Sequence, residues 1–228
     1  MKKFELTTDS IKRNGVTLYR IKSLIDFEDV KAGDLGGYVE KEENLSQSGN
    51  AWAYGNAQVY RNALVSGNAR VYGNARVYGD AWVYGNAEVS VDACVYGNAR
   101  VYGNAWVSGN AFVYGNAEVS GDACVSGNAL VSGDARVSGD ARVSGNARVF
   151  GNARVSGDAD YIHLKEFGSH NRNTTMFREE NGNIYVSCGC FSGTLEEFES
   201  KVKETHGNNK FAREYLALVE AAKIHFEV

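Results

Sequence analysis

The 228-residue sequence contains no proline, and none of its four histidines lies before His163. Proline cannot donate to a sheet, so its absence fits a fold in which nearly every interior amide is hydrogen-bonded. No apolar run reaches the length of a transmembrane segment, and the residues after Met1 lack the apolar stretch of a signal peptide. The sequence therefore predicts no membrane partner.

Cysteine and net charge are also low. Four cysteines are too few for a disulfide framework, which favours a reducing cytoplasm as the compartment. A formal net charge of −4 gives no general attraction to nucleic acid, so no nucleic-acid partner is expected. The spacing of Gly33, Gly36 and Gly37 differs from that of phosphate-binding fingerprints, and no cofactor is predicted.

One hexapeptide makes up half of the chain. From Gly49 to Ile162 the pattern Gly-Asn/Asp-Ala-x-Val-x occurs nineteen times. The second place is always Asn or Asp, the third is always Ala, and the fifth is Val except at Ala53 and Tyr161. In an extended backbone the third and fifth places share a face, so Ala and Val are predicted to form the core. A six-residue period is typical of β-solenoids.

The pattern resembles the left-handed hexapeptide-repeat β-helix, in which three hexads complete one triangular coil. We therefore predict an all-β solenoid, a left-handed parallel β-helix of about six triangular coils. Asn and Asp tolerate positive φ better than other non-glycine residues, so the second place is predicted to be the left-handed corner. Arg61 and Val91 replace the Gly of the first place, so this place is predicted not to require Gly and to favour it only because space for a side chain is limited there.

The segments on either side of the repeat have ordinary compositions. Residues 1–48 are predicted to form an N-terminal cap with a hairpin turn at Asn14-Gly15, and residues 49–162 the β-helix. Residues 163–228 are predicted to form a small C-terminal α+β domain. It would contain a hairpin turn at 179–182, a helix that starts with a capping box at Thr194, and a second helix from about Lys210. Both flanks are predicted to cover the open ends of the solenoid.

Part of the first flank points to a known family. Asp26-Phe27, the run Asp29-Val30-Lys31-Ala32-Gly33, Gly36-Gly37 and Leu45-Ser46-Gln47 resemble the segment that precedes the repeat in YdcK-like hexapeptide-repeat proteins. Those proteins are labelled as acyltransferases on the basis of their fold. Related chains are common in phages and prophages, and the run Ser187-Cys188-Gly189-Cys190-Phe191 resembles the terminal piece of those members. The resemblance implies a phage or prophage origin and thus the cytoplasm of a host cell.

Hexapeptide-repeat acyltransferases use a histidine on or beside the prism as a general base. Residues 49–162 contain no histidine and no inserted loop, which argues against catalysis on the prism. If the protein is an enzyme, His163 and His170 are the candidate bases.

Two further groups in the last domain are candidates for binding. The polar run from Ser169 suits a small anionic ligand, since it offers several donors and two cations; the alternative interpretation is a solvated loop. The candidate residues are His170, Asn171, Arg172, Thr175 and Arg178. Cys188 and Cys190 would share one face of a strand, and no second cysteine pair completes a zinc site. A buried pair of structural thiols is therefore favoured over a metal centre.

If three hexads make one coil, outward-facing residues that are eighteen positions apart lie on the same face. Grouped in this way, they form two faces of mixed charge and one apolar face. Apolar patches on soluble proteins commonly mark association surfaces. We predict a homo-oligomer, most simply a trimer, whose interface contains Tyr78, Tyr96, Phe112, Tyr114, Leu130 and Phe150.

The sequence as a whole favours a non-catalytic, self-associating accessory or binding protein. Two alternatives stay open: a CoA-dependent acyltransferase of the hexapeptide-repeat type, and sequestration of a small anionic ligand or nucleotide.

Overall fold

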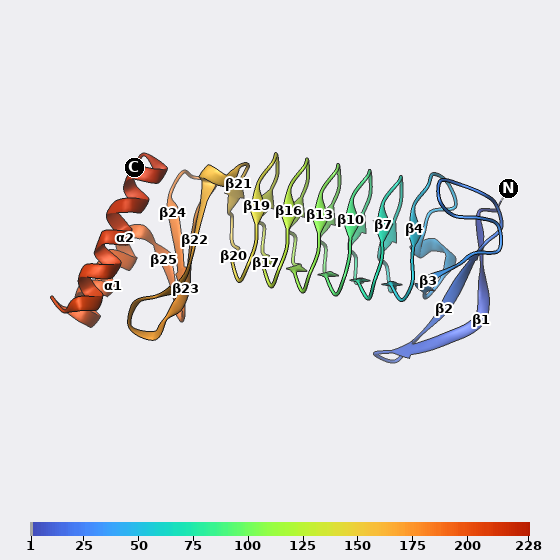
Figure 1. The fold of residues 1–228 in the computed structure, drawn as a ribbon, viewed down its shortest axis with the longest axis horizontal. Coiled ribbons are helices and arrows are strands. Elements are labelled where there is room, and N and C mark those ends of the chain that lie inside the picture. Colours follow the sequence, from blue (N-terminus) through green and yellow to red (C-terminus); the bar gives the residue numbers. More distant parts are fainter. Residues whose placement is uncertain (1) are drawn as a thin grey trace.

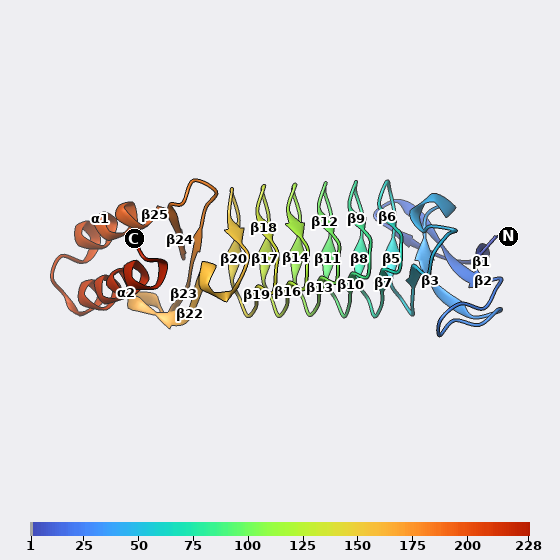
Figure 2. The same cartoon turned by 90° about the horizontal axis from the view of Figure 1, so that it is seen from above.

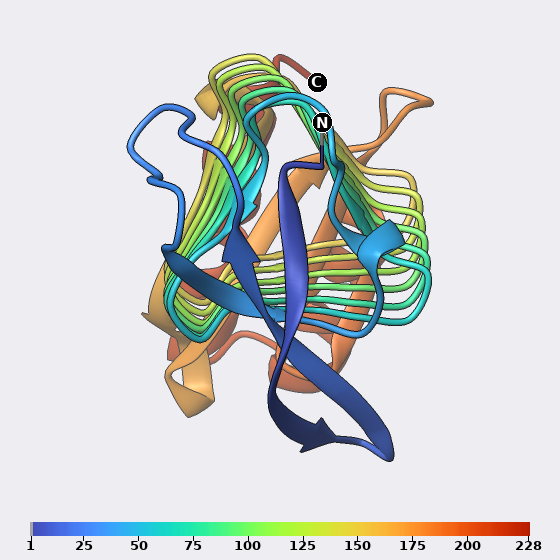
Figure 3. The ribbon, with the colours of Figure 1, turned by 90° about the vertical axis from the view of Figure 1, so that its right-hand side faces the viewer.

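The protein is a rod with its termini at opposite ends (Figure 1). The computed structural model describes residues 2–228, apart from the side chain of Asp158. A parallel β-solenoid forms the middle of the rod, which confirms the predicted fold class. Seen along the axis, the solenoid has three sides, and the hairpin of β1 (Phe4–Arg13) and β2 (Val16–Ser23) crosses its amino-terminal end (Figure 3).

Within the solenoid, each side is a parallel sheet whose short strands occupy the fourth and fifth places of every third hexad. The first side, here called the Phe112 face, contains β3 (Leu35–Val39), β5 (Gln58–Val59), β8 (Arg76–Val77), β11 (Cys94–Val95), β14 (Phe112–Val113), β17 (Leu130–Val131) and β20 (Arg148–Val149). The second, the Trp106 face, contains β4 (Trp52–Ala53), β7 (Arg70–Val71), β10 (Glu88–Val89), β13 (Trp106–Val107), β16 (Cys124–Val125) and β19 (Arg142–Val143). The third, the Trp82 face, contains β6 (Leu64–Val65), β9 (Trp82–Val83), β12 (Arg100–Val101), β15 (Glu118–Val119), β18 (Arg136–Val137) and β21 (Arg154–Val155).

The register confirms that eighteen residues make one turn. Phe112 pairs with Cys94 on one side and with Leu130 on the other. Inside the prism, Ala111 and Val113 are fully buried, as are the equivalent Ala and Val of the neighbouring turns. Each coil therefore buries its small apolar residues against the coils before and after it, so stability is close to a sum of nearest-neighbour contributions.

The prediction for the corner residue was wrong. The first place of the hexad has positive φ in every repeat from Gly49 to Gly151, with φ of 73° at Gly103. Arg61 and Val91 also adopt positive φ, at 61° and 63°. A Cβ added to Gly103 would lie 2.9 Å from the backbone nitrogen of Gly121 in the next coil. Glycine is thus favoured at this place both by its conformation and by the close stacking of the corners.

The uniform Asn or Asp of the second place has a different cause. Its side chains form ladders along the corners, each amide donating to the residue eighteen positions later. Asn86 Nδ2 donates to Asn104 Oδ1 at 3.0 Å, and Asn104 Nδ2 donates to Asp122 Oδ1 at 2.9 Å. These side chains are exposed, so each ladder bond contributes modestly, on the order of 1 kcal/mol or less.

The backbone hydrogen bonds give the prism two chemically different ends. In a typical hexad, the amides of Asn104, Trp106 and Ser108 donate to carbonyl oxygens of the next coil at 2.8 to 2.9 Å. The first coil is therefore left with carbonyl oxygens that need donors, and the last coil with amides that need acceptors.

Donors of the amino-terminal cap satisfy the first coil. The Lys3 ammonium donates to the carbonyl oxygens of Ala51 at 2.8 Å and Gly49 at 3.2 Å. The amide of Tyr38 in β3 donates to Ala57 O at 2.8 Å, and the side chain of Asn44, at the end of the short helix η1 (Glu42–Asn44), donates to Ala63 O at 2.8 Å. The parallel stack thus begins within the predicted cap. These bonds cover the open edge of the first coil.

Acceptors of the following segment satisfy the last coil. The amide of Arg148 donates to Thr175 Oγ1 at 3.2 Å, and the amide of Ser156 donates to Asp160 Oδ2 at 2.8 Å, in the short helix η2 (Asp158–Asp160). Phe177 is fully buried in the solenoid core. The C-terminal domain is thus joined to the prism by hydrogen bonds and by packing.

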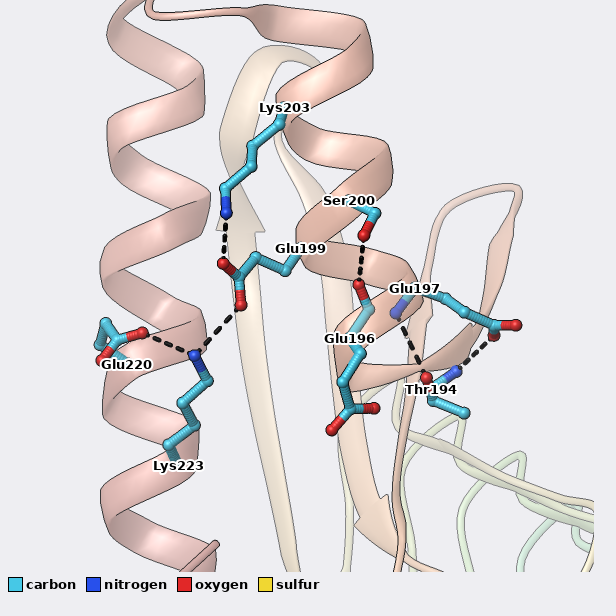
Figure 4. A network of polar contacts seen from close by, with 8 residues as sticks. All are labelled: Thr194, Glu196, Glu197, Glu199, Ser200, Lys203, Glu220 and Lys223. Atoms are coloured by element: carbon cyan, nitrogen blue, oxygen red, sulfur yellow. Dashed lines mark hydrogen bonds and ion pairs between the residues drawn. The ribbon is translucent and has the colours of Figure 1, made fainter.

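The C-terminal domain is a sheet with two helices on its far side (Figures 1 and 2). Its strands and helices are β22 (Tyr161–Phe167), the short helix η3 (Gly168–His170), β23 (Arg172–Arg178), β24 (Ile184–Cys188), β25 (Phe191–Thr194), α1 (Leu195–His206) and α2 (Lys210–Phe226). The predicted capping box is confirmed, with Glu197 N donating to Thr194 Oγ1 (Figure 4). Glu199 of α1 joins the helices by pairing with Lys203 and with Lys223 of α2, and both cations lower its pKa (Figure 4).

We predict that Gly103→Val destabilises the protein by about 3 kcal/mol, through strained backbone and the clash with the next coil. Asn104→Val should cost about 1 kcal/mol, because it removes exposed ladder bonds only. Val91→Gly should stabilise by about 1 kcal/mol, since it relieves positive φ at a β-branched residue. Chemical unfolding of the three variants measures these differences, and equal losses at Gly103 and Asn104 would contradict the assignment of the corner.

A second prediction concerns the buried ammonium of Lys3. Burial lowers its pKa from 10.5 to about 8. Between these values the unfolded chain binds the proton that the folded chain has released, so raising the pH stabilises the folded state. We expect the free energy of unfolding of the wild type to increase from about pH 8 to 10.5 relative to a Lys3→Gln variant. Parallel pH profiles in urea unfolding of the two proteins would contradict this.

Candidate functional site

The residues predicted for catalysis and binding lie in the C-terminal domain and at its junction with the last coil. His163 is on β22, next to the end of the solenoid, and its ring contacts Thr175 of β23 across the sheet. The distance from His163 Nδ1 to Thr175 Oγ1 is 3.1 Å. The same hydroxyl oxygen accepts the amide of Arg148, so His163 is connected by hydrogen bonds to the edge of the prism.

The second ring nitrogen of His163 is buried and has no hydrogen-bond partner within the described residues. It lies against Gly145 at the corner of the last coil. Burial and the nearby Lys165 ammonium lower the pKa of His163, which favours the neutral imidazole. Its side chain also lines an open depression of 450 Å³ with Arg142, Tyr161 and Lys165. A general base must reach the proton of its substrate, and the free nitrogen of His163 is screened from solvent.

His170 is placed differently. It ends the short helix η3, its side chain is exposed, and Nδ1 lies 2.9 Å from Ser169 Oγ. It lines a cavity of 390 Å³ that does not include His163. The two candidate bases therefore belong to different sites.

The predicted ligand loop is divided between two hollows. Asn171, Arg172 and Thr175 line a depression of 390 Å³ together with Arg148 of the last coil. Arg172 also lines the cavity of His170. Arg178 takes no part in either: its guanidinium donates to Phe226 O at 2.7 Å, lies 3.8 Å from Asp160 Oδ1, and stacks on the Phe226 ring. Arg178 of β23 therefore holds the end of α2 against the sheet.

The prediction of a buried pair of thiols was wrong. Cys188 ends β24 and is buried, with the Thr174 hydroxyl donating to its sulfur at 3.2 Å. Gly189 then turns the chain with φ of 61°, and Cys190 is exposed. Within residues 2–228, leaving aside the side chain at 158, no group of three or more His, Cys, Asp or Glu could hold a metal ion.

Sequence reasoning missed the contribution of the helices. The cavity of His170 is completed by Phe198, Lys201 and His206 of α1 and by Tyr215 of α2. The capping box at Thr194 and the helical spacing after Lys210 predicted two helices, but they did not indicate that the sheet and the helices leave a cavity between them.

The six apolar residues predicted to form an interface lie along the Phe112 face, and the flanking segments pack against the two ends of this strip. Tyr78 packs beside the β1–β2 hairpin, and Phe150 packs against Phe177 and Tyr185 of the C-terminal domain. The open part lies between them. It consists of Tyr96, Phe112, Tyr114 and Leu130.

Comparison with known proteins bears on the solenoid. The YdcK β-solenoid repeat family matches residues 69–85, 93–109, 123–139, 135–149 and 147–159. A relative from Escherichia coli (strain K12), named "Uncharacterized acetyltransferase YdcK", is 43% identical over 51 residues. The aligned region is 22% of this chain and 15% of the relative, so most of the relative's length has no counterpart in the alignment. The predicted resemblance is confirmed; the phage origin stays a prediction.

Proposed function

We propose that this protein, a YdcK-like β-solenoid, is a non-catalytic binding protein that associates with copies of itself through the Phe112 face, as a homotrimer. One observation carries the proposal. The open part of that face exposes Phe112 beside the half-buried Tyr96, Tyr114 and Leu130, between the β1–β2 hairpin and the C-terminal domain.

The strip is already ordered in the single chain. The rings of Tyr78 and Tyr96 stack with centroids 4.9 Å apart, and those of Tyr96 and Tyr114 with centroids 5.0 Å apart. Phe112 lies beside this stack and is 38% exposed. Aromatic side chains held in place lose little conformational entropy on association, so they are efficient contact residues. A trimer follows from the resemblance to hexapeptide-repeat proteins, whose prisms pack side by side around a threefold axis.

The repeat also favours binding over catalysis. The solenoid has no histidine and no inserted loop, so it lacks the two features by which hexapeptide-repeat acyltransferases place their general base. No helix among the described residues is long and apolar enough to cross a membrane. The cytoplasm, that of a host cell if the chain is encoded by a phage, is part of the proposal.

We predict that Phe112→Asp with Leu130→Asp converts the wild-type oligomer to a monomer, because three chains cannot bury these carboxylates together. Light scattering on the eluting protein measures the mass, and circular dichroism should show an unchanged β-sheet signal. Trp82→Asp with Trp106→Asp is the matched control, since these rings are 49% and 48% exposed on the other two faces. A wild type that is monomeric at micromolar concentration would overturn the proposal.

The second candidate function is acetyl transfer from CoA, favoured by the name of the Escherichia coli relative. His163, connected to Thr175 at the edge of the prism, would be the base, and a movement of β22 would have to expose its buried nitrogen. In that case acetyl-CoA turnover should be measurable in the wild type and should fall at least about a hundredfold in His163→Gln. His225→Gln, an exposed position at the end of α2, is the control. Absence of turnover in the wild type would leave the binding function.

A further inference from the structure

The C-terminal domain contains a cavity of 390 Å³ between its sheet and its helices. This volume is within the range of small-molecule sites, about 300–1,000 Å³. The walls come from five parts of the fold: η3, the first residue of β23, the turn between β24 and β25, α1 and α2.

The interior of the cavity is aromatic. Phe198 contacts Phe191 with ring centroids 5.2 Å apart and Tyr215 with centroids 5.6 Å apart. His206 stacks on Tyr215 at 5.7 Å. Phe198 and Tyr215 are buried in the core of the domain, so these rings form a fixed surface for a flat apolar group.

The charge at the cavity has one sign. Arg172 and Lys201 line it with His170 and His206, and none of its lining residues is Asp or Glu. Lys201 pairs with Glu204 on the outside of α1 at 2.8 Å. The Arg172 guanidinium donates to the Cys190 sulfur at 3.7 Å, and no carboxylate of the described residues forms an ion pair with it. A thiol is a weak acceptor, so the guanidinium keeps donors for an anion.

We propose that this cavity binds a small organic anion with a flat apolar body, such as an arylcarboxylate, its ring among Phe191, Phe198 and Tyr215 and its carboxylate at Arg172. A divalent cation would find no carboxylate ligand in the lining. A neutral aromatic compound would leave the Arg172 guanidinium without an anionic partner. No residue of the Phe112 face lines the cavity, although Leu130 lines a neighbouring hollow together with Cys190 and Phe191.

Binding can be measured with anilinonaphthalene sulfonate, a fluorescent aromatic anion, on the full-length protein. We expect saturable binding, and competition by naphthalene carboxylate. Naphthalene methanol has the same ring without the charge and should compete about tenfold more weakly, a difference of about 1.4 kcal/mol. Equal competition by the acid and the alcohol would overturn the role of Arg172.

Two variants test the location. Arg172→Gln should raise the dissociation constant for naphthalene carboxylate about tenfold, while Lys203→Gln, on the same helix as Lys201 but outside the cavity, should leave it unchanged. Thr205→Trp, at an exposed position on the cavity wall, should block the site, while Ala221→Trp on the exposed side of α2 should not. Phe112→Asp alone, at a residue that lines neither the cavity nor the hollow beside it, should leave binding intact. Loss of binding in this last variant, or full binding in folded Arg172→Gln and Thr205→Trp, would overturn the proposal.

Cys190 provides an independent readout, because it is exposed and lines the cavity. Naphthalene carboxylate at saturation should slow the alkylation of Cys190 by iodoacetamide several-fold, as followed by peptide mass spectrometry. Cys124, half-buried on the Trp106 face, is the internal control and should react at an unchanged rate. An unchanged rate at Cys190 under saturating acid would place the bound anion elsewhere and contradict the assignment.

Discussion

The hydrogen bonds between successive coils are the interaction on which the rest of the structure depends. Three amides of a typical hexad donate to carbonyl oxygens of the next coil toward the carboxy-terminal end. The polar backbone groups of an internal coil are therefore paired on both sides, whereas each terminal coil has one unpaired edge. The two flanking segments therefore supply different groups, hydrogen-bond donors at the first coil and acceptors at the last. Lys3 and Asn44 bring donors to the first coil, and Thr175 and Asp160 bring acceptors to the last. The caps are therefore not interchangeable, and they also block edge-to-edge growth of the solenoid.

The same repetition limits where function can lie. The interior of the prism is filled with buried Ala and Val, and its corners are occupied by stacked backbone and by Asn or Asp ladders. The outer surface of the prism and the C-terminal domain, in which the sequence does not repeat, are the parts to which the two proposals assign binding. The apolar strip around Phe112 and the aromatic cavity beside Arg172 are consistent with this division.

Much of the architecture could be predicted because each local preference agrees with the global fold. The hexad gave the period of eighteen, the inward Ala and Val, and the residues that share a face. The capping box at Thr194 and the spacing after Lys210 located both helices. The prediction for the corner is wrong because Arg61 and Val91, which replace glycine at the first place, adopt positive φ as well, so the chain accepts strain there. The thiol pair was misjudged because the strand ends at Cys188.

The sequence by itself determined the solenoid, since a repeated hexad imposes the same local geometry and the same neighbours on every coil. Only the tertiary structure decided how the ends are closed and where a site is located. Lys3 meets Ala51, Arg178 meets Phe226, and Phe191 meets Phe198 and, through it, Tyr215 across different elements of the fold. Each of these contacts occurs once and depends on how whole elements pack, so it cannot be predicted from a local sequence pattern or from the period of the repeat.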